Sequence, residues 1–205
     1  MASKQLEKPV AKDAAVPAAT EKRAREELQD DDDANAADQV KKAKTTVGEK
    51  LADGSVAFDL SAKKQVTVRS WKSAVLVDLR EYYEAGGERK PGKKGISLPK
   101  DQFKKLMRLA SDVNAALAEV QDDEPGAYSA EKLKDAEEGA VAFALSSKRR
   151  VTVRKFKSML LVDIREFYES DGVQKPGSKG LSLTRDQWNK LQALHDDILA
   201  AVDTL

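Results

Sequence analysis

The chain has 205 residues, of which 40% are hydrophobic, 36 are Lys or Arg and 35 are Asp or Glu. It has no cysteine and one histidine, which excludes disulfides, thiolate catalysis, cysteine-ligated zinc and histidine-based metal sites or triads. Its apolar runs are too short to cross a bilayer or to act as a secretory signal, so we expect a soluble, intracellular protein that is not an enzyme and needs no cofactor or metal.

Residues 1–55 are rich in Ala, Lys, Glu and Asp and contain few large apolar side chains. Such a segment cannot bury enough surface to offset the entropy of ordering, so we expect a disordered charged arm. Within it, the basic stretches 22–25 and 41–44 flank the acidic run 30–33. This spacing resembles a two-part nuclear import signal, and we expect the protein in the nucleus.

Beyond the arm, the chain repeats itself. Residues 56–120 align without a gap on residues 141–205, at a constant offset of 85, and 35 of the 65 aligned positions are identical. The chain is therefore expected to contain two homologous domains of about 65 residues. Residues 121–140 join them, and we interpret this segment, with 7 acidic and 2 basic residues, as an acidic linker.

Each repeat begins with three predicted strands. In the first repeat, an apolar stretch at 56–61 is followed by 65–69, where valine alternates with threonine and arginine. This period-two pattern indicates a strand with one buried face. A longer alternating strand follows at 74–83, with Asp78 and Arg80 on the polar side. The second repeat shows the same pattern at the constant offset.

A fourth strand and a helix complete each repeat. Residues 84–95 are dense in Gly, Pro and Lys and predict a turn segment, which leads to a short strand at 96–98. A helix is predicted to begin near Pro99 and, in the second repeat, near Thr184, where Gln187 completes a likeness to a capping box. The order in each repeat is β-β-β-β-α.

Such a small unit is marginally stable alone, because a short chain buries a low fraction of its surface. The homologous neighbour is an available partner, since a short tether raises its effective concentration to roughly the millimolar range. We therefore expect a monomeric chain in which the two repeats pair as an intramolecular pseudo-dimer, packed through their helices.

The uncovered face of the first sheet is predicted to carry Arg69, Lys72 and Arg80 together with Trp71 and Tyr83. Single-stranded nucleic acid is recognised by this combination, because bases stack on aromatic rings while phosphates contact cations. A replication or repair factor that protects single strands and an RNA-binding protein remain alternatives. A further alternative is a protein-interaction scaffold whose acidic segments recruit partners while the sheets bind no nucleic acid.

Three motifs carry a family resemblance. VTVRSWK, VDLREYY and KPGKKGISL, repeated as VTVRKFK, VDIREFY and KPGSKGLSL, resemble the single-stranded-DNA-binding domain of the positive cofactor four family of transcriptional coactivators. The resemblance implies an α+β fold in which a curved, four-stranded antiparallel sheet and a kinked C-terminal helix form a dimer whose channels hold melted DNA. It also implies a coactivator that supports RNA polymerase II transcription, with general transcription factors and activators as partners.

The resemblance also implies the DNA-contacting positions. In the first repeat these are Lys63, Lys64, Arg69, Trp71, Lys72, Arg80, Tyr83, Lys90 and Lys94. In the second repeat they are Lys148, Arg149, Arg154, Phe156, Lys157, Arg165, Tyr168, Lys175 and Lys179. The second stacking residue, commonly Trp in the family, is Tyr here, and a usual lysine is replaced by Ala74 and Met159.

We interpret the remaining candidate groups structurally. Tyr82 and Phe167 are expected in the core, and His195 is expected at a packing or surface position on the helix. Carboxylates that neighbour arginines are expected to form ion pairs rather than a metal or acid–base site. These carboxylates are Asp78, Glu81, Asp163 and Glu166.

Overall fold

The computed structural model describes residues 48–123 and 125–205. The predictions for the arm up to residue 47, including the import signal, lie outside the described residues. Two antiparallel sheets, each followed by helices, make up the described part of the chain, all of which lies in one compact unit. This arrangement confirms the α+β class and the two repeated units.

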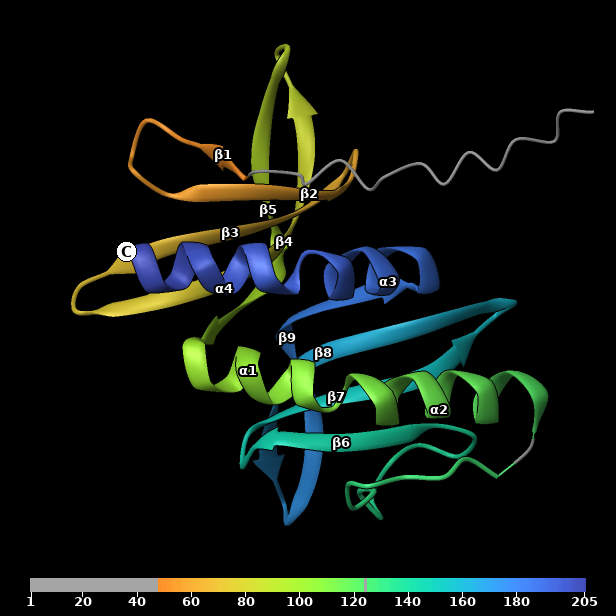
Figure 1. The fold of residues 1–205 in the computed structure, drawn as a ribbon. Helices are drawn as coiled ribbons and strands as arrows, with labels where there is room; N and C mark the ends of the chain where they lie inside the picture. Colours follow the sequence, from red (N-terminus) through yellow and green to blue (C-terminus); the bar gives the residue numbers. More distant parts are fainter. Residues whose placement is uncertain (1–47, 124) are drawn as a thin grey trace, which may run out of the picture. The chain divides into compact units, whose positions relative to one another are not determined.

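The first sheet has five strands in sequence order (Figure 1). They are β1 (Glu49–Lys50), β2 (Val56–Ser61), β3 (Lys64–Trp71), β4 (Ala74–Ala85) and β5 (Glu88–Pro99). Strand β1 corrects the sequence analysis, which assigned this sheet four strands and put residues 48–55 in the arm. Both residues of β1 are exposed and pair with β2 through their backbones, so hydrophobic patterning contains no sign of the strand.

The second sheet has the four strands that were predicted. They are β6 (Val141–Ser146), β7 (Arg149–Phe156), β8 (Met159–Ser170) and β9 (Val173–Thr184). Register irregularities fall at equivalent positions in the two sheets, between Arg80 and Tyr82 and between Arg165 and Phe167. The constant offset between the repeats therefore holds for the backbone as well as for the sequence.

Strands β5 and β9 are much longer than the short strands predicted at these places. In the first repeat the turn is reduced to Gly86 and Gly87, both at positive φ, and β5 then runs through Pro91. Proline is tolerated because β5 is the edge strand of its sheet, where a missing N–H need not break a ladder. The prediction of a long turn from the density of Gly and Pro is therefore wrong.

Each predicted helix begins where expected but is divided in two. The helices are α1 (Lys100–Arg108), α2 (Ala110–Asp122), α3 (Arg185–Ala193) and α4 (His195–Thr204). The breaks fall at Leu109 and Leu194, and the predicted capping box forms at the start of α3 between Thr184 and Gln187. The kink implied by the family resemblance is thus present in both repeats.

After the kink, each helix continues onto the sheet of the other repeat. Helix α1 packs on its own strands β4 and β5 and also contacts β6, whereas α2 packs on β7 and β8 of the second sheet. In the same way, α3 packs on β8 and β9 while α4 packs on β3 and β4 of the first sheet (Figure 1). One hydrophobic core draws on both repeats, including Phe58, Phe103, Phe143 and Trp188. The repeats are joined by exchanged helix segments rather than by helix-on-helix contact alone.

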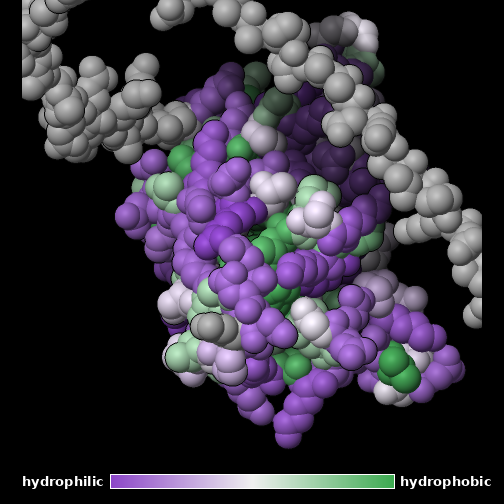
Figure 2. All heavy atoms as spheres, turned by 90° about the vertical axis from the view of Figure 1, so that its right-hand side faces the viewer, coloured by the Kyte–Doolittle hydropathy of each residue, from purple (hydrophilic) through white to green (hydrophobic). Residues whose placement is uncertain are grey.

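The surface of the described residues is largely hydrophilic on the face that Figure 2 shows, with hydrophobic residues visible only in small groups. Among the described residues, no helix is long and apolar enough to span a bilayer. Within the same ranges, no group of three or more His, Asp or Glu side chains is placed to hold a metal ion.

Candidate nucleic-acid interface

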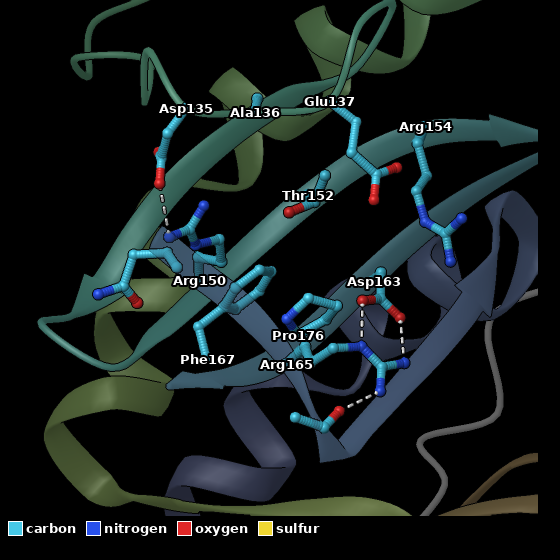
Figure 3. A pocket seen from close by; sticks show the side chains of 12 residues that line it. Asp135, Ala136, Glu137, Arg150, Thr152, Arg154, Asp163, Arg165, Phe167 and Pro176 are labelled. Atoms are coloured by element: carbon cyan, nitrogen blue, oxygen red, sulfur yellow. Dashed lines mark hydrogen bonds and ion pairs between the residues drawn. The ribbon is translucent and has the colours of Figure 1, made fainter. Parts of the chain in front are cut away.

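The outer face of each sheet is hollowed into a groove. The first groove is lined by Leu51, Asp53, Ser55, Thr67, Arg69, Asp78, Arg80, Tyr82, Pro91 and Gly92. The second groove is lined by Asp135, Ala136, Glu137, Arg150, Thr152, Arg154, Asp163, Arg165, Phe167, Gln174, Pro176 and Gly177 (Figure 3). Most positions of the first groove have their equivalent in the second, so the two grooves share one frame.

Two exposed aromatic rings lie at the ends of β3 and β7. Trp71 is 58% exposed and Phe156 is 48% exposed, although large aromatic side chains are usually mostly buried. The Arg69 guanidinium carbon lies 5.9 Å from the Trp71 ring centroid, and that of Arg154 lies 5.8 Å from the Phe156 ring. Each ring therefore has a cation from the groove beside it.

Lysines extend this arrangement at the hairpin between the strands. Lys72 and Lys157 follow the two rings directly and adopt the same left-handed conformation, with φ of 56°. A non-glycine residue rarely adopts this conformation, and its recurrence shows that the hairpin geometry is fixed in both repeats. Strand alternation puts Thr67, Arg69 and Trp71 on one face, and Lys72 is exposed in the turn that follows.

Arg80 and Arg165 form the floor of the grooves and are held by neighbouring groups. Arg80 donates to both oxygens of Asp78, at 2.8 and 3.0 Å, and to the Gly92 carbonyl at 2.8 Å. Arg165 makes the same contacts with Asp163 and the Gly177 carbonyl. The predicted ion pairs of Asp78 and Asp163 are thus present, and both arginines keep about a fifth of their side-chain surface exposed to the groove.

The surroundings of Arg80, Arg165 and Asp163 favour their charged forms. Hydrogen bonding to Asp78 and to Asp163 raises the pKa of Arg80 and of Arg165 above the usual value. Burial opposes ionisation of Asp163, but hydrogen bonds from Arg165 and Ser182 outweigh it and lower the pKa of this carboxyl. Both arginines therefore stay charged and fixed in position at the groove floor, each paired with a carboxylate.

Tyr83 and Tyr168 lie outside the groove linings, on the hairpins formed by β4–β5 and β8–β9. Both are 53% exposed, and each lies directly across the strand pair from a predicted lysine, Lys90 or Lys175. The structure therefore brings each tyrosine together with one lysine but leaves it apart from the ring at the end of β3 or β7.

Lys64 and Arg149 join the two repeats. The Lys64 ammonium donates to the Ser182 carbonyl at 2.7 Å and to the Gln187 side chain at 2.9 Å, and burial lowers the pKa of Lys64. Arg149 donates to Gln102 at 2.9 Å and pairs with Glu166 at 3.3 Å. These two predicted DNA contacts are thus engaged between the repeats in the structure.

The other predicted lysines are exposed at the edges of the sheets. Lys63 and Lys148 lie in the turns before β3 and β7. Lys94 lies 3.9 Å from Glu81, and Lys179 lies 3.7 Å from Glu166, distances at which exposed pairs are weak. These cations remain accessible to an anionic partner.

The prediction that Tyr82 and Phe167 belong to the core is wrong. Both line the grooves, because strand alternation puts them on the same face as Arg80 and Arg165. The Arg89 guanidinium lies over the Tyr82 ring at 5.0 Å, and that of Arg150 lies over Phe167 at 3.8 Å. Neither arginine was among the predicted contacts, although Gln65 and Arg89 correspond to Arg150 and Gln174 when the repeats are aligned.

These features define a tandem β-β-β-β-α protein whose two sheets carry arginine-lined grooves flanked by exposed aromatic rings. Residues 58–109 and residues 143–194 each match the family described as Transcriptional Coactivator p15 (PC4), and the chain belongs to this family. The resemblance identified from the three sequence motifs is thereby confirmed.

Curated relatives carry the same description. The RNA polymerase II transcriptional coactivator KIWI of Arabidopsis thaliana is 38% identical over 100 residues, which cover 48% of this chain and 94% of the relative. An RNA polymerase II transcriptional coactivator of Drosophila melanogaster is 32% identical over 105 residues, covering 51% of this chain and 84% of the relative. For the coactivator SUB1 of Saccharomyces cerevisiae, identity is 38% over 89 residues, covering 42% of this chain but only 30% of the relative.

Among solved structures, a crystal structure described as a MoSub1–ssDNA complex in phosphate buffer is 34% identical in sequence. The match covers 40% of this chain and 96% of the other, with a TM-score of 0.33.

Proposed function

We propose that this protein is a nuclear, single-stranded-DNA-binding coactivator of RNA polymerase II transcription that holds melted DNA in its two grooves. The observation that carries the proposal is the recurrence, in both repeats, of an exposed ring with an arginine beside it, Trp71 with Arg69 and Phe156 with Arg154. Stacking on an aromatic ring contributes about 1–3 kcal/mol per base, and adjacent cations bind the phosphates.

The charge distribution supports the same function. Each repeat places more bases than acids before its helix, with 9 against 4 in residues 61–98 and 9 against 4 in residues 146–183. The acids of the helices, including Asp196, Asp197 and Asp203, make these elements poor ligands for the major groove of a duplex. An open sheet face with rings and cations suits unpaired bases better than paired ones.

We also propose that the chain works as a monomer with its repeats paired, because the exchanged helices already supply each sheet with the segment that covers it. The curated relatives are described as RNA polymerase II transcriptional coactivators, which favours general transcription factors and activators as protein partners and the nucleus as the location. Light scattering should give the mass of a single chain, 22.5 kDa, and a stable species of twice that mass would contradict the monomer.

The test of nucleic-acid binding compares single-stranded DNA, bubble duplex, duplex and RNA of one length at one salt concentration. We expect single-stranded and bubble DNA to bind more tightly than duplex. The logarithm of the affinity should fall with the logarithm of salt at about −0.7 per neutralised phosphate, hence about −3 for four contacts. Preference for RNA would favour an RNA-binding protein, and absence of binding at low salt would favour a protein-interaction scaffold.

A further inference from the structure

The two grooves differ at one edge, where the segment preceding the first long strand of each repeat passes over the sheet. Residues 48–55 run along the first groove, and residues 133–140, counted in the linker by the sequence analysis, run along the second. The two segments correspond at the offset of 85, and each has a glycine at positive φ, Gly54 or Gly139. The structural repeat therefore begins earlier than the sequence repeat.

The segment at this edge is more acidic in the second repeat. At the offset of 85, Lys50 is replaced by Asp135 and Ala52 by Glu137. Asp53, the carboxylate that this segment contributes to the first groove, accepts hydrogen bonds from its neighbour Ser55, and these bonds, together with the charge of Arg69, lower the pKa of Asp53. In the second groove, Asp135 of the segment makes a direct ion pair with an arginine of the sheet.

Asp135 binds a cation of the second groove directly. Its carboxylate accepts from Arg150 at 3.0 Å, while the Arg150 guanidinium rests on the Phe167 ring (Figure 3). Only 10% of the Arg150 side chain is exposed, against 50% of that of Asp135. Glu137 reaches from the same segment toward Thr152 and Arg154 in Figure 3. The cations that a phosphate would contact in this groove are thus already faced by carboxylates.

The residues that precede this segment are fixed by short hydrogen bonds, whereas the segment itself makes few bonds to the sheet. Upstream, Asp112 accepts from the Ser129 backbone at 2.6 Å, and Glu119 accepts from Tyr128 at 2.6 Å. Over the groove, residues 133–140 form no strand, in contrast to β1, and one backbone hydrogen bond, from Leu133 to Ala142, ties them to β6. The segment can therefore leave the groove while the chain on either side stays in place.

We propose that residues 133–140 form an acidic flap that covers the edge of the second groove in the free protein and is displaced when a single strand binds there. Displacement frees Arg150, which then contacts a phosphate as a ligand particular to the second groove. The first groove, which has Gln65 at the position of Arg150, needs no such displacement. The two grooves therefore differ in affinity, and the first fills before the second. This inference rests on the proposed function and adds its regulation.

Tryptophan fluorescence can follow each groove separately. The chain has two tryptophans, of which Trp188 is fully buried and Trp71 stands beside the first groove. Trp71 emission therefore reports binding to the first groove, and the variant W71F/F156W moves the reporter to the second. The ligand is an oligothymidine of about 10 nucleotides, within the usual range of single-strand site sizes.

In the chain without flap substitutions, we expect the Kd reported at the second groove to be about five- to tenfold weaker than at the first in low salt. Removing the flap charges with D135N/E137Q should tighten the second groove by about the same factor, leave the first unchanged, and have less effect at high salt. The control variant D122N/E131Q removes two exposed linker carboxylates that do not line the groove. It should change neither Kd by more than about twofold.

The flap would be overturned if D135N/E137Q and D122N/E131Q gave the same Kd at the second groove, or if D135N/E137Q tightened both grooves equally. A different failure belongs to the proposed function: neither reporter responds to oligothymidine at low salt in any variant. Because the two failures give different titrations, the experiment separates them.

Discussion

The two repeats of this chain share a buried polar frame and differ where side chains meet solvent or each other. The bonds from Arg80 to Asp78 are 2.8 and 3.0 Å long, and those from Arg165 to Asp163 are 2.8 and 2.9 Å long. Ser97 donates to Asp78 and Ser182 donates to Asp163, both at 2.5 Å. The comparison indicates that this frame fixes the groove shape, while the rim is free to vary between repeats.

At the rim, the two repeats place an arginine over the inner aromatic ring from different strands. In the first repeat, Arg89 of β5 lies over the Tyr82 ring and pairs with Asp59 at 2.6 Å. In the second repeat, Arg150 of β7 lies over Phe167 and pairs with Asp135 of the flap. Each groove thus keeps a cation over its inner ring. In the first repeat the cation comes from the strand after the one that carries the ring, and in the second repeat from the strand before it. The carboxylate partner also changes.

The largest expected effect on stability comes from substitutions in the shared core. Phe103 and Trp188 occupy equivalent helix positions and are fully buried, but only Trp188 bonds across the repeats, to Asn114 at 2.8 Å. We expect Trp188→Ala to lower the free energy of unfolding by about 3–5 kcal/mol, and Phe103→Ala by somewhat less. Urea denaturation followed by circular dichroism measures both.

The control for this comparison is Asn114→Ala, which removes the hydrogen bond and leaves the ring, at a cost of about 1 kcal/mol. Because α2 and α4 each cover the sheet of the other repeat, every variant should still unfold in a single transition. Two separate transitions would contradict the shared core.

The second prediction concerns the buried frame, where the repeats should behave alike. Asp78→Ala and Asp163→Ala each leave a partly buried arginine without its carboxylate, and we expect a loss of about 2–4 kcal/mol in unfolding free energy for either.

The pKa of Asp163 is lowered by folding, so the stabilisation that its charge provides is fully present above the usual value of 3.8 and is lost as the pH falls through the lower folded pKa. Asp163→Ala should therefore flatten the loss of stability below pH 4, as thermal melts across pH can measure. If the stability of this variant still falls steeply below pH 4, other carboxylates are responsible for the acid dependence.

Short-range features of this fold were predictable from sequence. Alternation in QVTVR and RVTVR predicted β3 and β7, and the capping box at Thr184 predicted the start of α3, because both patterns lie within a few residues. The ion pairs of Asp78 and Asp163 were also expected from adjacent arginines. The prediction that Tyr82 is in the core was wrong because its hydrophobic ring was given more weight than its position in the strand alternation.

Long-range features were not predictable in this way. The breaks at Leu109 and Leu194 carry neither glycine nor proline, and they fall where each helix passes to the other sheet. The exposed residues of β1 and the pairing of Asp135 with Arg150 depend on how distant segments meet. A sequence pattern reports burial along one element, whereas these contacts follow from the assembled fold.

The third prediction compares the outer rings. Trp71→Ala and Phe156→Ala should each weaken binding of oligothymidine by about 1–3 kcal/mol, and Trp71→Ala more, because its larger ring offers more stacking surface. Both side chains are about half exposed, so the unfolding free energy should stay nearly constant. Fluorescence anisotropy of a labelled oligothymidine measures the affinity, with Lys190→Ala on the exposed side of α3 as a control. Unchanged affinity in both ring variants would exclude stacking at these positions.

The smallest expected effect comes from exchanging the inner cation. Arg150→Gln removes the guanidinium from the Phe167 ring and from Asp135, and we expect a loss of about 1 kcal/mol in unfolding free energy, since Asp135 is half exposed although Arg150 is largely buried. Adding Gln174→Arg restores the pattern of the first repeat, in which the cation comes from the edge strand. R150Q/Q174R should regain the cation–ring contact but not the ion pair, because Ala144 stands where the first repeat has Asp59.

A double-mutant cycle over these two positions isolates their coupling. A positive coupling of about 0.5 kcal/mol, seen in urea denaturation, would mean that the two strands can supply the cation interchangeably. The triple variant A144D/R150Q/Q174R then adds the missing carboxylate and should recover most of the remaining loss. If the double variant is no more stable than Arg150→Gln, the cation over Phe167 stabilises the sheet only when Asp135 holds it there, and the inner ring and the flap form one unit.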